Sequence, residues 1–180
     1  NRDRAYNRLR ERFPSWEQVL DAPTEEIADA IRPGGIADVK ARRIQEILGE
    51  IEGRESKLDL GRLNELGDAD VVDYLVSLPG VGPKTAACVL LFAMGREAFP
   101  VDTHVHRVVD RLGLVAAGSA EAAHRVLEPA IPPGLRYELH MQLIRHGRET
   151  CKPHTPLCSH CVLFDLCDAG PTLVASGAAR

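Results

Sequence analysis

The chain has 180 residues, of which 44% are hydrophobic and 27% charged, and its formal net charge is −4. This content suffices for the core of one large domain or two small interleaved ones, and the negative charge argues against wholesale coating of nucleic acid. No apolar run approaches the ~20 residues that span a bilayer, and no signal-peptide pattern opens the chain, so we expect a soluble intracellular protein. Because the first residue is Asn1 rather than Met, we also expect that part of the N-terminus is missing from this sequence.

Helix start and stop signals recur along the chain, whereas strand patterns are missing almost everywhere. Ser15 opens SWEQ, a capping box in which Gln18 reaches back to the cap amide. Thr24 precedes two glutamates, which suit the positive end of a helix, and the Pro-Gly-Gly turn at residues 33–35 ends that helix. Further helices are expected over residues 37–53, 68–78, 84–95, 102–113, 119–131 and 135–147. The sequence therefore predicts an all-α fold of many short helices.

Two glycine-rich turns join pairs of these helices, in RPGGIADVKA and in LPGVGPKTA, and both are typical of helix-turn-helix hairpins. In the second turn, Pro83 fits the first helical position, and Gly80 and Gly82 permit backbone angles that are closed to other residues. The free amides of such a turn form an anion site, for which a phosphodiester bound without base reading is the obvious ligand. Gly80, Val81 and Gly82 are therefore predicted to contact a phosphate backbone.

Lys84 follows that turn as the second helical residue and precedes the apolar run at residues 89–91. The positive end of a helix and apolar surroundings both favour the neutral, nucleophilic form of an amine. One interpretation is thus a catalytic amine that points into a pocket. The other is a solvent-facing lysine that contacts phosphate or nothing.

Asp102, in AFPVDTHVHRV, is a second candidate for chemistry. Its simplest interpretation is a helix cap. The functional interpretation is a carboxylate beside Lys84 that takes up a proton or stabilises positive charge on a sugar. One carboxylate can serve in both roles.

Four of the five cysteines crowd into CKPHTPLCSHCVLFDLC, with the spacing C-x6-C-x2-C-x5-C. Cys151, Cys158, Cys161 and Cys167 can close around one structural metal centre, because such crowding in an intracellular chain favours a metal over disulfides. The spacing suits a tetrahedral zinc or a 4Fe–4S cluster and leaves the choice open. Cys88 stands alone in an apolar helix and is interpreted as a buried, unreactive thiol.

Together, LPGVGPKTA, then VDTHVHRV, then HGRETC with the cysteine spacing resemble the endonuclease III group of helix-hairpin-helix DNA glycosylases. The resemblance covers nearly the whole chain, with the three motifs in the order and spacing of the family. It implies a six-helix domain over residues 1–97, with the hairpin at about residues 71–93, and an iron–sulfur domain over residues 98–180. It also implies a base-excision repair protein that acts as a monomer on duplex DNA, in the cytoplasm at the bacterial nucleoid.

The resemblance places the catalytic lysine on Lys84 and the catalytic aspartate on Asp102. It assigns a 4Fe–4S cluster, rather than zinc, to the four cysteines. Relatives that only cut the glycosidic bond replace the lysine, so its presence implies a bifunctional glycosylase and AP lyase whose usual substrates are oxidised pyrimidines. Ile36, in GGIADVKA, resembles the wedge that fills the vacated base stack, although a core residue at a helix start fits the sequence too.

Two alternatives remain open at this stage. The first is a monofunctional glycosylase of the same fold, acting on mispairs or uracil. The second is a non-catalytic, cluster-bearing protein that binds DNA. The segment that precedes this point in the family, with a DNA-plugging glutamine, is not in this sequence, so either the sequence is partial or another residue has that role. The interval between Cys151 and Cys158 is also less basic than in the family. We therefore expect weaker DNA affinity or a narrower substrate preference.

Overall fold

The computed structural model describes all residues 1–180, and its regular structure is entirely helical, which confirms the all-α prediction. The α-helices are α1 (Arg2–Arg12), α2 (Trp16–Asp21), α3 (Thr24–Ile31), α4 (Ala37–Glu55), α5 (Asp68–Val76), α6 (Pro83–Cys88), α7 (Thr103–Arg111), α8 (Ala120–Ala130), α9 (Arg136–Glu149) and α10 (Ala169–Ala175). Shorter helical turns are η1 (Arg32–Gly34), η2 (Gly61–Glu65), η3 (Val89–Ala93), η4 (Cys158–His160) and η5 (Phe164–Leu166). None of these helices combines the length and apolar character that crossing a bilayer requires.

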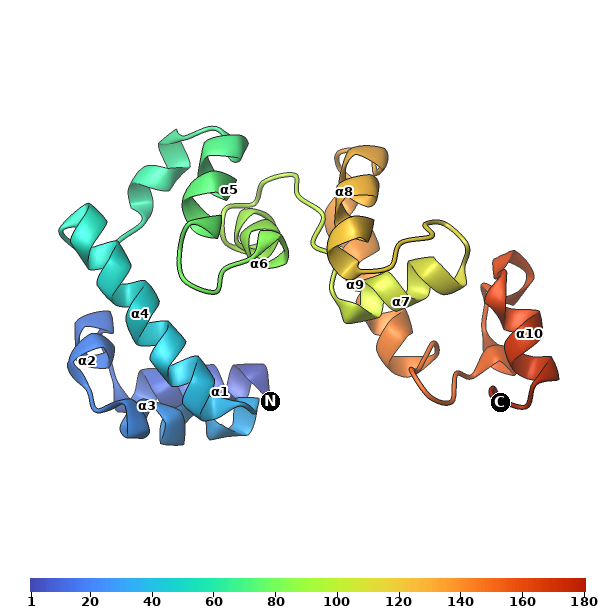
Figure 1. Cartoon of the computed structure of the whole chain (residues 1–180), viewed down its shortest axis with the longest axis horizontal. Coiled ribbons are helices and arrows are strands. Elements are labelled where there is room, and N and C mark those ends of the chain that lie inside the picture. Colours follow the sequence, from blue (N-terminus) through green and yellow to red (C-terminus); the bar gives the residue numbers. More distant parts are fainter. The chain divides into compact units, whose positions relative to one another are not determined.

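The helices form two compact units, Asn1–Val81 and Gly82–Arg180. The first unit holds α1 to α5 and the second holds α6 to α10, and both can be followed by colour in Figure 1. The boundary between residues 97 and 98 stays a prediction.

In the first unit, α4 packs against α2 and α3, and α1 packs against α3 (Figure 1). Ser15 and Gln18 form the predicted capping box at the start of α2. Gln45 of α4 donates from Nε2 to the carbonyl of Ala22 at 2.8 Å and accepts from Thr24 Oγ1 at 2.6 Å. These bonds connect α4 to the end of α2 and the start of α3. The core of the unit comprises Ala5, Leu9, Phe13, Val19, Ile27, Ala28, Ala30, Ile31, Ala37, Ala41 and Leu48.

The apolar segment at residues 84–95 is not the single buried helix that the sequence predicts. The α-helix ends at Cys88, and η3 continues as a π-helical turn in which the Met94 amide bonds to the Val89 carbonyl at 3.1 Å. Phe92 on this turn is 48% exposed. A π turn takes one more residue than an α turn, so the side chains of this segment do not keep the register of a single α-helix. Cys88 is a free thiol and is half-buried rather than fully enclosed.

The second unit is built around α7, which packs against α8 and α9. Val105, Val108 and Val109 lie at helical spacing on the buried face of α7. This face joins a core of Phe99, Val101, Val105, Val108, Val109, Val115, Ala123, Leu127, Ile131 and Leu143. The core fixes the start of α7, where Asp102 lies.

Candidate active site and cysteine centre

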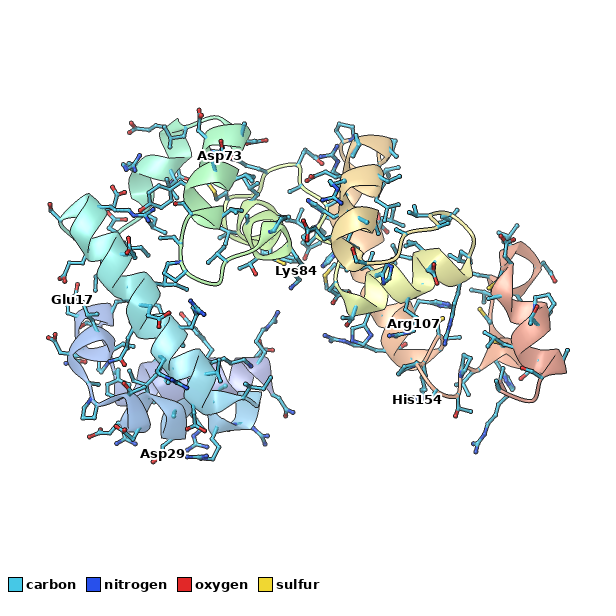
Figure 2. All side chains as sticks on the ribbon, viewed as in Figure 1. Glu17, Asp29, Asp73, Lys84, Arg107 and His154 are labelled. Atoms are coloured by element: carbon cyan, nitrogen blue, oxygen red, sulfur yellow. The ribbon has the colours of Figure 1, made fainter.

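Lys84 is the second residue of α6 and is exposed (Figure 2). Pro83 occupies the first helical position, as predicted, and the amides of Thr85 and Ala86 bond to the Gly82 carbonyl at 2.9 and 3.0 Å. Ala86 and Ala87 of the same helix are buried. Lys84 is solvent-accessible in this structure, and its role as the catalytic amine stays a prediction.

Asp102 is the N-cap of α7, as the sequence predicts. Its Oδ1 accepts hydrogen bonds from the amides of His104 at 2.8 Å and Val105 at 2.9 Å, and the residue is half-buried. Both bonds end on Oδ1, so the cap leaves Oδ2 available for a second role.

The charges of Lys84 and Asp102 both influence the pKa of a third residue, His140 of α9. Burial lowers the pKa of the His140 ring below its ordinary value of 6.5, and a hydrogen bond with the Pro100 carbonyl opposes this effect. The Asp102 charge also raises the pKa of the ring, whereas the Lys84 charge lowers it. Lys84, Asp102 and His140 all lie in the second unit, and the role of the first two as catalytic residues stays a prediction.

The sequence interpretation missed His140. The only available signal is its spacing, since His140, Leu143 and Gly147 form the buried face of α9. A histidine in that register looks like an ordinary core residue until its neighbours are known.

The predicted phosphate-binding turn contains a backbone conformation that requires glycine. Gly80 has φ of +67°, and the Val81 amide bonds to the Leu78 carbonyl at 3.2 Å. The side chain of Arg43, from α4, lies directly over Gly80. The structure therefore adds a guanidinium to this turn, although Arg43 also pairs with Glu46 at 2.9 Å.

Ile36 precedes α4 in the left-handed conformation, with φ of +52° and ψ of +43°. Its side chain is 73% exposed, so the interpretation of a core residue is wrong. A β-branched residue rarely adopts this conformation, and such strain is found at functional positions more often than elsewhere. The wedge role stays a prediction.

The four clustered cysteines border one small cavity in the second unit, together with Arg111 and His146, among others. All four are free thiols. Burial raises the pKa of the Cys158 thiol, and the charges of the other three cysteines raise it as well. No group of three or more Cys, His, Asp or Glu side chains in the structure is arranged to hold a single metal ion.

Two arginines of α7 hold the loop that begins with Cys151. Arg107 donates from Nε to the Cys151 carbonyl at 2.9 Å and from Nη2 to the Gly147 carbonyl at 2.6 Å. Arg111 donates to the Lys152 carbonyl at 2.7 Å and to Cys151 Sγ at 3.4 Å. Figure 2 shows Arg107 on α7. The helix that carries Asp102 at one end therefore organises the cysteine loop at the other.

A larger pocket, of about 510 Å³, lies in the first unit between α1, α4 and the loop at residues 58–60. Its lining is almost wholly apolar, with Asp59 as the exception. It contains none of the predicted catalytic residues, so the candidate chemistry lies elsewhere.

Comparison with known proteins identifies the class. Residues 2–133 match the HhH-GPD superfamily of base excision DNA repair proteins. Endonuclease III of Thermotoga maritima is 33% identical over 168 residues, which cover 93% of this chain and 75% of that protein. A candidate DNA glycosylase of Arabidopsis thaliana is 36% identical over 162 residues, which cover 89% of this chain. The chain spans only 53% of that plant protein.

Among solved structures, a trapped covalent intermediate of endonuclease III with DNA matches with a TM-score of 0.80 at 33% identity. The match covers 94% of this chain and 76% of that one. A non-covalent endonuclease III–DNA complex matches equally well, with a TM-score of 0.80. The chain therefore belongs to the HhH-GPD superfamily of base excision DNA repair proteins and is related to endonuclease III.

Proposed function

We propose that this chain is a bifunctional DNA glycosylase and AP lyase, which removes oxidised pyrimidines from duplex DNA and cuts the strand at the abasic site. The observation that carries the proposal is the placement of Lys84, near the start of α6, and of Asp102, at the cap of α7, in one compact unit, where both charges act on the pKa of the His140 ring. An amine nucleophile and an ionised acid are the two groups that this reaction requires. The covalent endonuclease III–DNA intermediate among the matching structures supports the same chemistry.

In the proposed reaction, Lys84 Nζ attacks C1′ of the damaged nucleotide. The C1′–N bond breaks, and the base leaves with the electron pair and takes up a proton. Asp102 accepts a proton from the attacking amine and stabilises the positive charge that develops on the sugar. Its Oδ2 is the oxygen suited to this role, because Oδ1 is occupied by the cap of α7.

Strand cleavage then follows from the covalent intermediate. The sugar ring opens to give a Schiff base between Nζ of Lys84 and C1′. A proton leaves C2′, and the C3′–O bond breaks so that the 3′ phosphate departs by β-elimination. Water then hydrolyses the Schiff base, which regenerates the free amine of Lys84 and leaves an aldehyde at C1′. No oxidant or reductant is needed.

DNA binding in this proposal uses the hairpin and the wedge. Gly80, Val81 and Gly82 approach the phosphate backbone, which they contact without reading bases. Exposed Ile36 fills the gap that a flipped base leaves, and an apolar side chain suits the interior of a base stack. Flipping costs a few kcal/mol, and less for a damaged pair, which favours lesions over intact DNA.

The four cysteines are proposed to hold a 4Fe–4S cluster. Their thiols border one cavity, which fits the donor set of such a cluster. Four thiolates also suit a tetrahedral zinc. The cysteine spacing resembles that of the endonuclease III group, which favours the cluster. Its role is to stabilise the fold around the Cys151 loop.

The decisive experiment is borohydride trapping on duplexes that carry thymine glycol or an abasic site. We expect the wild-type chain to form a covalent adduct with both and Lys84→Gln to form none, while a gel-shift assay shows retained binding. Lys57→Gln, which removes another exposed lysine, is the matched control and should trap normally.

Other outcomes separate the alternatives. Base release without an adduct would indicate a monofunctional glycosylase. Binding without base release, adduct or nicking would indicate a non-catalytic DNA-binding protein. Normal trapping by Lys84→Gln would overturn the assignment of the nucleophile.

A further inference from the structure

His140 is a deeply buried polar side chain, only 1% exposed, in a core that is otherwise apolar. Its Nδ1 lies 2.8 Å from the Pro100 carbonyl oxygen. Because a carbonyl only accepts hydrogen bonds, Nδ1 carries the proton. In the neutral ring, Nε2 is then an unprotonated acceptor.

The ring is also held by aromatic contacts. Phe99 meets it edge to face, with ring centroids 6.1 Å apart, and Phe92 lies at 5.5 Å. Pro100 is fully buried and stands two residues before Asp102. The hydrogen bond to Pro100 therefore connects α9 to the chain segment that enters the Asp102 cap.

Lys84 of α6 and Asp102 of the α7 cap are the charged groups that act on His140, and the other contacts come from Phe92, Phe99 and Pro100. Burial holds the pKa of the ring below 6.5, so the ring is neutral near pH 7. A charged ring here would repel the ammonium form of Lys84 and attract the Asp102 carboxylate.

We propose that His140 is a positioning residue for the reaction of Lys84 and Asp102. Its hydrogen bond fixes the Pro100 carbonyl and thereby the backbone segment that leads to the Asp102 cap. Its ring is also uncharged, at a position where a positive charge would repel Lys84 and attract Asp102. This inference rests on the proposed function and deepens it.

Two variants separate the hydrogen bond from the charge. His140→Asn keeps a donor near the position of Nδ1 but cannot titrate, whereas His140→Leu keeps an apolar side chain and loses the donor. At neutral pH we expect His140→Asn to form the borohydride adduct at close to the wild-type rate. His140→Leu should be slower by about tenfold, the scale of one lost buried hydrogen bond, with little change in the KM for abasic DNA.

The pH profile provides a readout that a purely structural role would not change. In the wild type, protonation of His140 adds to the loss of rate in acid, whereas His140→Asn lacks this contribution. We therefore expect the rate of adduct formation by His140→Asn to decline at a lower pH than the rate of the wild type. A wild-type rate and an unchanged pH profile in both variants would overturn the inference.

Nitrogen NMR of the histidine rings tests the inference on the wild-type fold, even if a variant at residue 140 misfolds. We expect His140 to be neutral at pH 7, with its proton on Nδ1. Its pKa should rise in Lys84→Gln and fall in Asp102→Asn. A charged ring at pH 7, or a proton on Nε2, would refute the assignment.

The two hypotheses fail in different ways. If the wild-type chain gives no adduct with abasic DNA, the proposed function fails. If the wild type traps and His140→Leu traps equally fast, the proposed function stands and the role of His140 is wrong.

Discussion

The side chain of Arg43 lies against the backbone of Gly80, so that a Cβ added to Gly80 would sit 2.5 Å from Nε and 2.8 Å from Cδ of Arg43. Gly80 also has φ of +67°. We predict that Gly80→Ala lowers the free energy of unfolding by about 1–2 kcal/mol through the left-handed backbone alone, and by more through the clash. Urea denaturation followed by circular dichroism measures this loss.

Gly82→Ala is the matched control for that prediction. Gly82 has φ of −100°, and nothing lies within 4 Å of its added Cβ, so its cost should stay within about 0.5 kcal/mol. Adding Arg43→Ala to Gly80→Ala should recover the part of the loss that comes from the clash. Equal costs at the two glycines would contradict the geometry of the turn.

Substitutions of Ile36 should change stability and activity in different directions. Ile36→Gly should raise the free energy of unfolding by about 1 kcal/mol, because it relieves the left-handed conformation of a β-branched residue. The same change removes the proposed wedge and should slow base release from duplex DNA. Ile36→Ala is the control, since it loses the wedge but retains a left-handed residue with a Cβ. A fall in stability in Ile36→Gly would refute the claim of strain.

The two roles of Asp102 can be separated by substitution. Asn is as good a cap as Asp, so Asp102→Asn should unfold at nearly the wild-type urea concentration while base release is lost. Asp102→Ala should lose base release and also about 1 kcal/mol of stability, because the amides of His104 and Val105 lose their acceptor. Undiminished base release in Asp102→Asn would limit this residue to its structural role.

Arg111 should govern how firmly the cysteine loop is held. Arg111→Ala removes donors from the carbonyls of Lys152 and Pro153 and from Cys151 Sγ, and should lower stability by about 2 kcal/mol. Iron content after purification and the rate of iron loss to a chelator measure the effect on the proposed cluster. Arg125→Ala breaks an exposed ion pair with Glu121 and should change neither property. Identical iron loss in the two variants would contradict this role.

The pair of His124 and Glu128 predicts a dependence of stability on pH. The hydrogen bond between them raises the pKa of His124 above 6.5 and lowers the pKa of Glu128 below 4.5. The histidine contribution is full below pH 6.5 and is lost as pH rises through its raised pKa. The glutamate contribution is present above pH 4.5 and is lost as pH falls through its lowered pKa.

The pair should therefore stabilise the second unit most between pH 4.5 and 6.5, by no more than about 1 kcal/mol because it is only partly buried. Comparing urea midpoints of the wild type and His124→Gln/Glu128→Gln across this range tests the prediction. A stability difference that keeps growing above pH 8 would contradict it.

The features that the sequence determined by itself depend on residues close together in the chain. The capping box of Ser15 and Gln18, the Asp102 cap and the start of α6 at Pro83 all depend on residues within one helical turn. The cysteine spacing is local in the same sense, because a loop of that length returns all four thiols to one cavity. Short-range signals of this kind can be read without knowing the rest of the fold.

The surroundings of the candidate site residues depend on contacts between segments that are distant in the sequence. The charges of Lys84 and Asp102 act on His140 from different helices, and the Arg43 side chain of α4 lies over Gly80 of the hairpin turn. The exposure of Lys84 and the left-handed conformation of Ile36 also follow from packing rather than from neighbouring residues. A single sequence does not contain these relationships in readable form, since the burial and charge environment of a side chain are properties of the whole fold.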